Sequence, residues 1–336
     1  MEYPSLDKPI AGAIRFNTDS SQLEIYDGNQ WTGILGTSPE LHTGGGRGVA
    51  AGGNVPSQTD VIEYITISTT GDSIDFGNLT AARQAIPGGT GSSTRGVIGG
   101  GQEHPATVNT IDFITFASTG NASDFGDLTV ARRQPGTTGS QTRGIFSGGE
   151  APNATNHIDY ITIAATGNAV DFGDLSVSRR IASAASSPTR SLIMGGYASP
   201  ASLNSIEFVT IATLGNGADF GDISTARYSN AGASSSTRAV VMGGYATSPG
   251  AALDTIDYVT IATLGNAIDF GNLTEAIYLA QTASDSIRAV RMGGVTPLDT
   301  SMDYIHIAST GNAVDYGDLL STHKEGAGLS NAHGGL

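Results

Sequence analysis

One phrase returns six times along this chain of 336 residues, and it limits the possible folds more than any other feature. The third copy, residues 158–175, is IDYITIAATGNAVDFGDL. The copies begin at Ile62, Ile111, Ile158, Ile206, Ile256 and Met302, so successive starts are 49, 47, 48, 50 and 46 residues apart. A fixed period of this length is typical of repeat architectures. The chain is therefore predicted to fold as six similar units.

Each unit is predicted to contain four short strands. In the second copy these are the small-residue segment 83–93, the apolar run 94–101, the aromatic strand 110–117 and a returning strand in 123–128. The Gly-Asn step after the aromatic strand is typical of a tight reversal whose residues reach positive φ. Long helices are not expected, because 47 residues are glycine and only 14% are charged.

The repeats are predicted to stack on one another. A sheet of fewer than about fifty residues cannot bury two apolar faces alone, so each needs a neighbour on both sides. The period lies near that of the WD40 and kelch families, which favours blades around an axis. We therefore predict an all-β fold over residues 47–336, a six-bladed β-propeller of four-stranded antiparallel blades. The glycine- and serine-rich segments are expected to form the crowded innermost strands.

The end of the chain is predicted to close the ring. Residues 321–336 begin a further period and do not complete it, while the first copy starts abruptly at Arg47 without a clear inner strand. We expect the C-terminal segment to supply that strand and to join the last blade to the first.

The repeat resembles a kelch repeat over roughly residues 47–320. The resemblance rests on the order of a small-residue strand, Thr-Arg, an apolar strand, Gly-Gly, a variable loop, an aromatic strand and Ala-Arg-Arg. Where kelch blades usually carry Trp, this chain has Phe76, Phe125, Phe172, Phe220, Phe270 and Tyr316. The repeat phrase is also similar to repeats of uncharacterised virion proteins of marine cyanophages and related bacteriophages.

The first 38 residues do not follow the period. Residues 12–34, GAIRFNTDSSQLEIYDGNQWTGI, alternate apolar and polar positions around a turn, which predicts a β-hairpin. An isolated hairpin is marginal in water, so it should dock on another surface or associate with copies of itself. The candidate anchor or oligomerisation residues are Ile14, Phe16, Leu23, Ile25, Tyr26 and Trp31. Residues 39–46 are predicted to be a glycine-rich linker.

The N-terminal segment resembles short segments of phage tail fibres that are found near attachment or oligomerisation regions. The resemblance implies that other virion proteins are partners through this segment. It also implies a homo-oligomer, either a trimer or another symmetric assembly.

Several kinds of chemistry are disfavoured by composition. Asp171-Phe172-Gly173 matches the metal-binding triplet of protein kinases, but kinases use it once beside other motifs, and this chain has only two lysines, Lys8 and Lys324. The absence of cysteine excludes disulfides, thiolate zinc sites and a thiol nucleophile. A net charge of −15 makes nucleic acids and anionic membranes poor partners, and no apolar run is long enough to span a membrane.

The six histidines are scattered and recur at no repeat position, so solvated loop residues are expected rather than a metal site. They are His42, His104, His157, His306, His323 and His333.

Acidic residues recur at two repeat positions. One set is Glu63, Asp112, Asp159, Glu207, Asp257 and Asp303, and the other is Asp75, Asp124, Asp171, Asp219, Asp269 and Asp315. These carboxylates could line a calcium-binding rim, but arginines recur as well, and pairs between blades are favoured over a metal. We predict structural pairs between Arg95, Arg143, Arg190 and Arg238 and Asp124, Asp171, Asp219 and Asp269, with no metal or cofactor.

The loops between the glycine pair and the aromatic strand differ from copy to copy and would share one rim, where specificity is expected. Candidate binding residues in these loops are Tyr197, Tyr245, His104 and Asn153, with the two tyrosines as stacking platforms.

The sequence favours a non-enzymatic bacteriophage virion protein, carried on a tail fibre, baseplate or capsid surface. It would adhere to a host-surface glycan or protein through many weak contacts, or serve as a decoration that binds nothing outside the virion. One alternative is a glycan-active enzyme, a polysaccharide depolymerase or sialidase-like protein, for which Glu275 and Arg291 are the irregular repeat positions. The other is an intracellular kelch-type adaptor.

Overall fold

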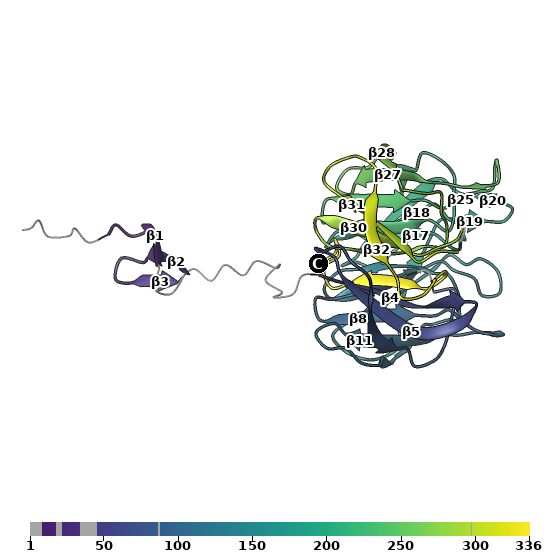
Figure 1. The fold of residues 1–336 in the computed structure, drawn as a ribbon, viewed down its shortest axis with the longest axis horizontal. Helices are drawn as coiled ribbons and strands as arrows, with labels where there is room; N and C mark the ends of the chain where they lie inside the picture. The colour runs from purple at the N-terminus through teal and green to yellow at the C-terminus, as the bar shows by residue number, and fades with distance from the viewer. Residues whose placement is uncertain (1–8, 18–21, 34–45, 87, 297) are drawn as a thin grey trace, which may run out of the picture. The chain divides into compact units, whose positions relative to one another are not determined.

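The computed structural model describes residues 9–17, 22–33, 46–86, 88–296 and 298–336. The chain divides into two compact units, Met1–Thr43 and Gly44–Leu336. All regular structure in the described ranges is β-strand (Figure 1), so they contain no helix long and apolar enough to cross a membrane. The prediction of an all-β chain is confirmed.

The smaller unit is a three-stranded antiparallel sheet of β1 (Ile14–Asn17), β2 (Gln22–Tyr26) and β3 (Trp31–Gly33). The predicted hairpin is present as β1 and β2, but the prediction missed the third strand. The chain reverses a second time because the Asp27 carboxylate accepts hydrogen bonds from the N–H groups of Asn29 and Gln30, at 2.7 and 2.8 Å. Such a turn is typical of aspartate. It brings Trp31 back opposite Tyr26, on a third strand.

The larger unit contains, in its described part, six four-stranded antiparallel sheets, which confirms the predicted strands of each repeat. In pairing order, the first sheet is β33 (Ala327–Ser330), β4 (Arg47–Val55), β5 (Ser57–Thr66) and β6 (Ile74–Asn78). The second is β7 (Gly89–Gly91), β8 (Arg95–Gly99), β11 (Thr110–Thr115) and β12 (Ser123–Asp127). The third is β13 (Gly136–Gly139), β14 (Arg143–Ser147), β15 (His157–Thr162) and β16 (Val170–Asp174).

The other three sheets repeat this arrangement. The fourth is β17 (Ser183–Ser186), β18 (Arg190–Met194), β21 (Ser205–Thr210) and β22 (Ala218–Asp222). The fifth is β23 (Ala231–Ser234), β24 (Arg238–Met242), β27 (Thr255–Thr260) and β28 (Ile268–Asn272). The sixth is β29 (Gln281–Ser284), β30 (Arg288–Met292), β31 (Ser301–His306) and β32 (Val314–Asp318). Short hairpins, β9–β10 (Gln102–Glu103, Ala106–Thr107), β19–β20 (Tyr197–Ala198, Ala201–Ser202) and β25–β26 (Tyr245–Ala246, Ala251–Ala252), project from loops.

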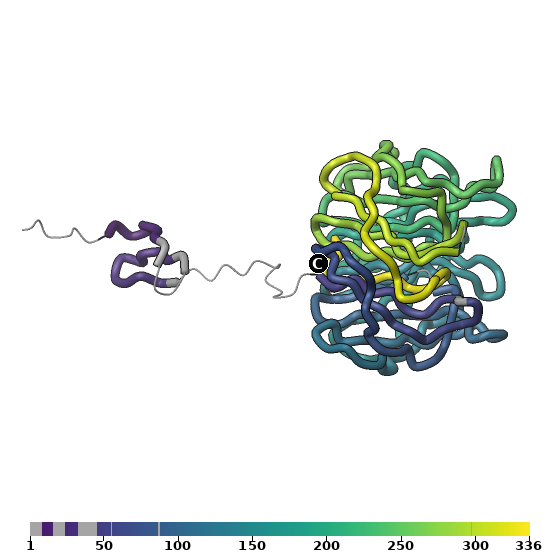
Figure 2. Tube along the Cα trace, viewed as in Figure 1, coloured from purple at the N-terminus to yellow at the C-terminus, as the bar shows by residue number. Residues whose placement is uncertain are grey.

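The first sheet combines both ends of this unit. Its first strand, β33, comes from the C-terminal segment and pairs with β4, with Leu329 opposite Val49. Figure 2 shows the yellow C-terminal segment beside the purple start of the unit. The first strands contact one another in the order β7, β13, β17, β23, β29 and β33, and β33 contacts β7 in turn.

Small residues dominate these first strands because their backbones approach closely. A Cβ atom added to Gly232 would lie 2.7 Å from the carbonyl oxygen of Ala184 on the neighbouring sheet, which no side chain tolerates. Serine hydroxyl groups bridge the same gaps. The Ser234 hydroxyl donates to the carbonyl of Ser186 at 2.8 Å, and the Ser284 hydroxyl donates to the carbonyl of Ser234 at 3.1 Å.

The hydrophobic core lies between the sheets. One cluster joins Ile158 and Phe172 of the third sheet to Ile193 and Val209 of the fourth. The repeated aromatic residues are each about 2% exposed: Phe76, Phe125, Phe172, Phe220, Phe270 and Tyr316. Burial of each such side chain contributes about 1.5–3 kcal/mol.

The Asp-Phe-Gly triplet lies on the fourth strand of its sheet and has a packing role. Gly173 has φ of 146°, beside a shift in register between β15 and β16. The Phe172 carbonyl accepts a hydrogen bond from the N–H group of Gly215 in the next repeat at 3.0 Å. A Cβ atom on Gly173 would lie 2.5 Å from the Gly215 carbonyl oxygen. Glycine is therefore needed both for backbone conformation and for the approach of the next sheet.

Gly173→Ala should lower the free energy of unfolding by more than Gly167→Ala. Gly167 has φ of 154°, but a Cβ atom there would meet nothing within 4 Å. Alanine at Gly167 should therefore cost only the backbone strain of about 1–3 kcal/mol. Alanine at Gly173 adds the clash with the next sheet. Urea unfolding of both variants measures the difference, and equal losses would contradict the packing role.

Candidate functional site

The segment that connects the last strand of one sheet to the first strand of the next is here called a crossing. Buried ion pairs join these crossings to the sheet that they enter. In the third sheet, Asp159 is within 3.1 Å of the Arg132 guanidinium and accepts a hydrogen bond from the Thr129 hydroxyl at 2.7 Å. Arg132 and Thr129 both lie in the segment that enters this sheet. Among the described residues, the arginine pairs in which both side chains are fully or almost fully buried are Arg83–Asp112, Arg132–Asp159, Arg179–Glu207, Arg227–Asp257 and Arg291–Asp303.

The predicted ion pairs therefore name the wrong residues. Ion pairs occur at repeat positions, but they use the first acidic set and arginines that were not assigned to them. The expected acidic partners Asp124, Asp171, Asp219 and Asp269 are exposed. Successive side chains of a strand point to opposite faces, so the Asp that precedes each buried Phe must point outward.

The other repeated arginines have a different role. The Arg95 guanidinium lies 4.4 Å from the centre of the Phe113 ring and donates to the Ile163 carbonyl of the next sheet at 2.9 Å. Arg143, Arg190 and Arg238 donate to carbonyls one repeat further on in the same way, those of Ile211, Ile261 and Ile307. These residues connect neighbouring sheets without a carboxylate partner.

The irregular Arg291 is explained by an exchange of two side chains. In the crossing that enters the sixth sheet, buried Ile277 occupies the position held by Arg179 in the crossing that enters the fourth. Arg291 instead reaches the site from β30, 2.8 Å from Asp303, and donates to the carbonyls of Gly293 and Ser301 at 3.0 and 2.9 Å. Arg179 donates to the equivalent carbonyls, those of Gly195 and Ser205. The guanidinium group thus occupies the equivalent place in both sheets, although it comes from the crossing in the fourth sheet and from β30 in the sixth.

His323 takes the place of arginine where the sixth sheet joins the first. It is buried, with Nε2 3.0 Å from the Glu63 carboxylate and Nδ1 3.1 Å from the Gly52 carbonyl oxygen. The Leu320 N–H group also donates to Glu63, at 3.0 Å. Burial alone would raise the pKa of Glu63, but hydrogen bonds from His323 and Ser73 outweigh it and hold the pKa below its usual value of 4.5.

This junction should lose stability in acid. Because the pKa of Glu63 is lower in the folded chain than in the unfolded chain, its stabilisation is complete above pH 4.5 and disappears as the pH falls through the lower folded value. Glu63→Gln should cost about 1–3 kcal/mol at pH 7. The cost should shrink below pH 4, which urea unfolding between pH 3 and 7 measures. A difference that does not depend on pH would contradict the assignment.

The histidine prediction is only partly correct. His104, His157 and His306 are exposed, whereas His323 is buried. His42 lies outside the described residues. The Nε2–H group of His333 donates to the Gly91 carbonyl, 2.9 Å away, and burial lowers the pKa of His333, partly offset by that hydrogen bond.

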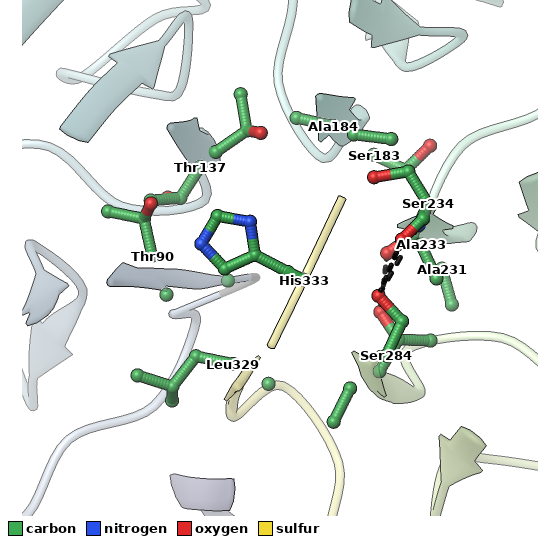
Figure 3. A pocket seen from close by; sticks show the side chains of 18 of the residues that line it. Thr90, Thr137, Ser183, Ala184, Ala231, Ala233, Ser234, Ser284, Leu329 and His333 are labelled. Carbon is green, nitrogen blue, oxygen red and sulfur yellow. Dashed lines mark hydrogen bonds between the residues drawn. The ribbon is translucent and has the colours of Figure 1, made fainter. Parts of the chain in front are cut away.

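A polar cavity of about 60 Å³ lies where the first strands converge. Figure 3 shows hydroxyl groups of Thr90, Thr137 and Ser234 around it, with His333 beside them. This volume suits a few water molecules and is too small for a sugar or a peptide. The C-terminal residues fill one end, where a Cβ atom on Gly335 would collide with the Gly139 carbonyl. The cavity is therefore not the candidate site.

The candidate site is a chain of side chains at the opposite end of the first strands, which we call the rim arc. Each repeat offers two such positions, the residue after the buried crossing position and the residue after the glycine pair, which pair through the backbone as in Arg180 and Tyr197. Ten of these twelve positions form the arc, and Val295 and Lys324 hold the other two. Its members in order are Asn54, Gln84, Gln102, Arg133, Glu150, Arg180, Tyr197, Tyr228, Tyr245 and Tyr278.

Each member of the rim arc contacts the next. The amide part is joined by hydrogen bonds of 2.5 Å between Asn54 and Gln84 and 3.2 Å between Gln84 and Gln102. Arg133 then bonds to Gln102 at 3.3 Å and pairs with Glu150 at 3.2 Å. Arg180 pairs with the same carboxylate at 2.6 Å. The arc thus changes from amide to ionic side chains without a gap.

The remaining four members form the tyrosine row. Arg180 lies 5.3 Å from the centre of the Tyr197 ring. The ring centroids of Tyr197, Tyr228, Tyr245 and Tyr278 follow at 5.2, 5.7 and 5.3 Å. All four side chains are half-buried, and none of their hydroxyl groups has a hydrogen-bond partner within the described residues. Burial and the neighbouring phenols raise the pKa of Tyr228, so its hydroxyl stays protonated.

The structure brings two of the predicted binding residues together, Tyr197 and Tyr245. It adds Tyr228 and Tyr278, which the sequence did not single out because they follow the repeat phrase at the place of the second Arg in Ala-Arg-Arg. His104 is exposed in the β9–β10 hairpin, with its N–H group bonded to Gln58, and Asn153 is exposed in a neighbouring loop. Neither belongs to the rim arc.

The predicted anchor residues lie on both faces of the small sheet. Ile14 pairs with Ile25, and their side chains are 60% and 37% exposed. On the other face Tyr26 is buried against Trp31, with ring centroids 5.4 Å apart. The Arg15 guanidinium lies 4.3 Å from the Trp31 ring. The side chains of Phe16 and Leu23 lie outside the described residues.

The chain enters the larger unit at the end opposite the rim arc. The Arg47 N–H group donates to the Asn331 side chain at 2.7 Å, beside the C-terminal residues. In Figure 1 the C-terminus lies on the left of this unit, while β19 and β25, which contain Tyr197 and Tyr245, lie on the right. The arc therefore lies at the end of this unit opposite to Arg47 and the C-terminal residues.

A second acidic feature accompanies Arg291. Glu275 is 3.7 Å from that guanidinium and accepts a hydrogen bond from the Ser301 hydroxyl at 3.0 Å. Burial raises the pKa of Glu275, with a further contribution from Asp299. Burial also acts on Asp299, but hydrogen bonds from Ser301 and Thr300 lower its pKa. The two carboxyl groups thus differ in proton affinity.

No group of three or more His, Cys, Asp or Glu side chains in the described ranges is arranged to hold a metal ion. No protein-family model matches the chain, and no curated protein matches it.

Proposed function

We propose that the chain is a non-enzymatic virion protein of a bacteriophage. In this proposal residues 47–336 form a six-bladed, kelch-like β-propeller that adheres to the host surface. The observation that carries the proposal is the rim arc, a continuous set of half-buried side chains that includes four phenol hydroxyl groups without a hydrogen-bond partner among the described residues. Such side chains are common at binding surfaces, where one end is apolar and the other remains hydrated.

Two cycles of hydrogen bonds support a closed ring of blades. In the first, six residues with φ between 54° and 61° lie in the crossings: Ala85, Gln134, Ile181, Ser229, Leu279 and Glu325. Each of the last five donates its N–H group to the carbonyl of the one before, and the Ile86 N–H group donates to Glu325, all at 2.8–3.2 Å. In the second, an arginine of each sheet donates a hydrogen bond to a backbone carbonyl of the next sheet. The cycle begins with Arg47, which donates to the Phe116 carbonyl, and ends with Arg288, which donates to the Ser68 carbonyl of the first sheet at 2.9 Å.

The location on a virion is supported by the resemblance of the repeat phrase and of residues 12–34 to phage proteins. The geometry of the larger unit agrees with such a role, because the chain enters it at the end away from the rim arc. Residues 1–38 would then attach to other virion proteins, with residues 39–46 as the linker. Many copies on one particle would convert weak contacts at the arc into firm adhesion.

The test uses the full-length chain and purified phage. Mass spectrometry should find the protein in particles, and cryo-electron microscopy should show a disc-shaped domain on their surface. The labelled chain should bind cells of the phage host, with or without a calcium chelator. Its absence from particles, or equal binding to all bacteria tested, would overturn the proposal.

The carboxyl pair Glu275 and Asp299 favours one second candidate, a glycan-active enzyme. Neighbouring carboxyl groups with opposed pKa shifts are typical of acid and base partners in glycoside hydrolysis. Incubation of the chain with host polysaccharide should release no reducing ends if the protein only adheres. Sustained release that Glu275→Gln abolishes would establish the enzyme instead.

A further inference from the structure

We infer that the tyrosine row binds an uncharged polysaccharide of the cell surface, laid across several rings. This inference rests on the proposed adhesion function and specifies the ligand of the same site. It begins from four aromatic side chains, Tyr197, Tyr228, Tyr245 and Tyr278, contributed by four successive connections, two within sheets and two between sheets.

The chemistry of the row suits sugars. A pyranose ring presents an apolar face of C–H groups and a margin of hydroxyl groups. A half-buried tyrosine offers the matching surfaces, an aromatic ring for contact and a hydroxyl that both donates and accepts. The hydroxyls of the row lack partners within the described residues, so a ligand that bonds to them displaces only water.

The shape of the surface suits a polymer rather than a single sugar. The cavities described nearby measure about 60 and 20 Å³, and the first of them is the one that the C-terminal residues close. Neither of these two cavities could admit a terminal sugar. Rings spaced 5.2–5.7 Å apart instead offer a series of contacts to successive sugar units.

Charge favours an uncharged ligand. Arg180, which lies beside Tyr197, and Arg133 share the Glu150 carboxylate at 2.6 and 3.2 Å, so one of their two positive charges is compensated. The chain as a whole carries −15, which repels polyanions over long distances. An acidic polysaccharide would therefore be disfavoured as it approached.

A proline-rich peptide is the other ligand that aromatic surfaces commonly bind. Such peptides use grooves between aromatic side chains. The tyrosines here contact one another at interplanar angles of 51–64°, which leaves no slot between adjacent rings. The polysaccharide is therefore favoured, and the peptide becomes an outcome of the test.

The experiment measures retardation of the full-length chain in gels that contain dextran, mannan or galactan, with alginate and polygalacturonate as the acidic set. A proline-rich peptide is tested by fluorescence anisotropy. At least one neutral polysaccharide should retard the protein. Tyr228→Ala should weaken this binding by about tenfold or more, which corresponds to about 1.4 kcal/mol. Tyr228→Phe should retain part of it, because the ring remains.

The matched control is Tyr258→Ala. Tyr258 is also half-buried, but it packs against Phe270 and lies under Arg238, away from the rim arc. This change should lower the melting temperature and leave retardation unchanged, which separates binding from general stability.

Binding only to acidic polysaccharides, binding only to the peptide, or neutral binding that Tyr228→Ala leaves unchanged would each overturn the inference. Protease treatment of host cells distinguishes its failure from that of the proposed function. If treatment abolishes adhesion, the receptor is a protein and the adhesion function stands without this ligand. If the chain adheres to no host cell, the proposed function itself fails.

Discussion

Arg291→Ile should lower the free energy of unfolding by about 3–5 kcal/mol, since it leaves the Asp303 carboxylate buried without its cation. The carbonyl groups of Gly293 and Ser301 lose their donor as well. Isoleucine fits the position by volume, because the equivalent residue of the fourth sheet is the fully buried Ile193. The loss should therefore come from the unpaired charge rather than from poor packing. Chemical denaturation at pH 7 measures it.

Adding Ile277→Arg to this variant should recover most of the loss. The new guanidinium would enter from the crossing, as Arg179 does in the crossing that enters the fourth sheet, where it pairs with Glu207. Ile277→Arg alone should destabilise, because a second guanidinium group would then be buried beside that of Arg291 and both would compete for Asp303. The four proteins form a double-mutant cycle whose coupling energy should be several kcal/mol. Additive effects would show that the two positions do not share one site.

Removal of residues 327–336 should abolish cooperative unfolding of the larger unit or lower its melting temperature sharply. The deletion takes away β33, which pairs with β4 and buries Leu329 between the first strands. It leaves β4 with unpaired N–H and carbonyl groups along one edge. Scanning calorimetry of the purified chain measures the change, and a deletion without effect would contradict the role of β33.

Two variants make this result specific. Leu329→Ala keeps the strand and removes only side-chain contacts, so it should cost about 2–5 kcal/mol. Deletion of residues 1–43 removes 43 residues before the larger unit, compared with the ten residues of 327–336. Because those residues belong to a separate compact unit, the main transition should keep its midpoint.

Much of the architecture could be predicted because its causes are local and repeat at a fixed period. Two examples are the glycine in Asp171-Phe172-Gly173, which the approach of the next repeat requires, and the small residues of β17. The ion pairs could not be predicted in the same way. Whether Arg95 or Arg83 meets a carboxylate depends on which face of its strand or crossing it occupies, and both recur with the same period.

The binding surface was only half visible in the sequence for a related reason. Tyr197 and Tyr245 lie in variable loops, where specificity is expected. Tyr228 and Tyr278 follow parts of the repeat that vary little between copies. Only the structure shows that each lies beside the loop after the glycine pair of the sheet that it enters. A search for aromatic residues at the position after the buried crossing residue, Arg227 or Ile277, would have found both.

The origin of β33 has a consequence for biosynthesis. Within this unit β33 is synthesised last, whereas β4, β5 and β6 are synthesised first. Until β33 has left the ribosome, the first sheet has only three strands and an open edge that neighbouring nascent chains can join. Products of termination before β33 would keep that edge permanently, so only polypeptides that include β33 bury it, and shorter ones are exposed to aggregation or proteolysis.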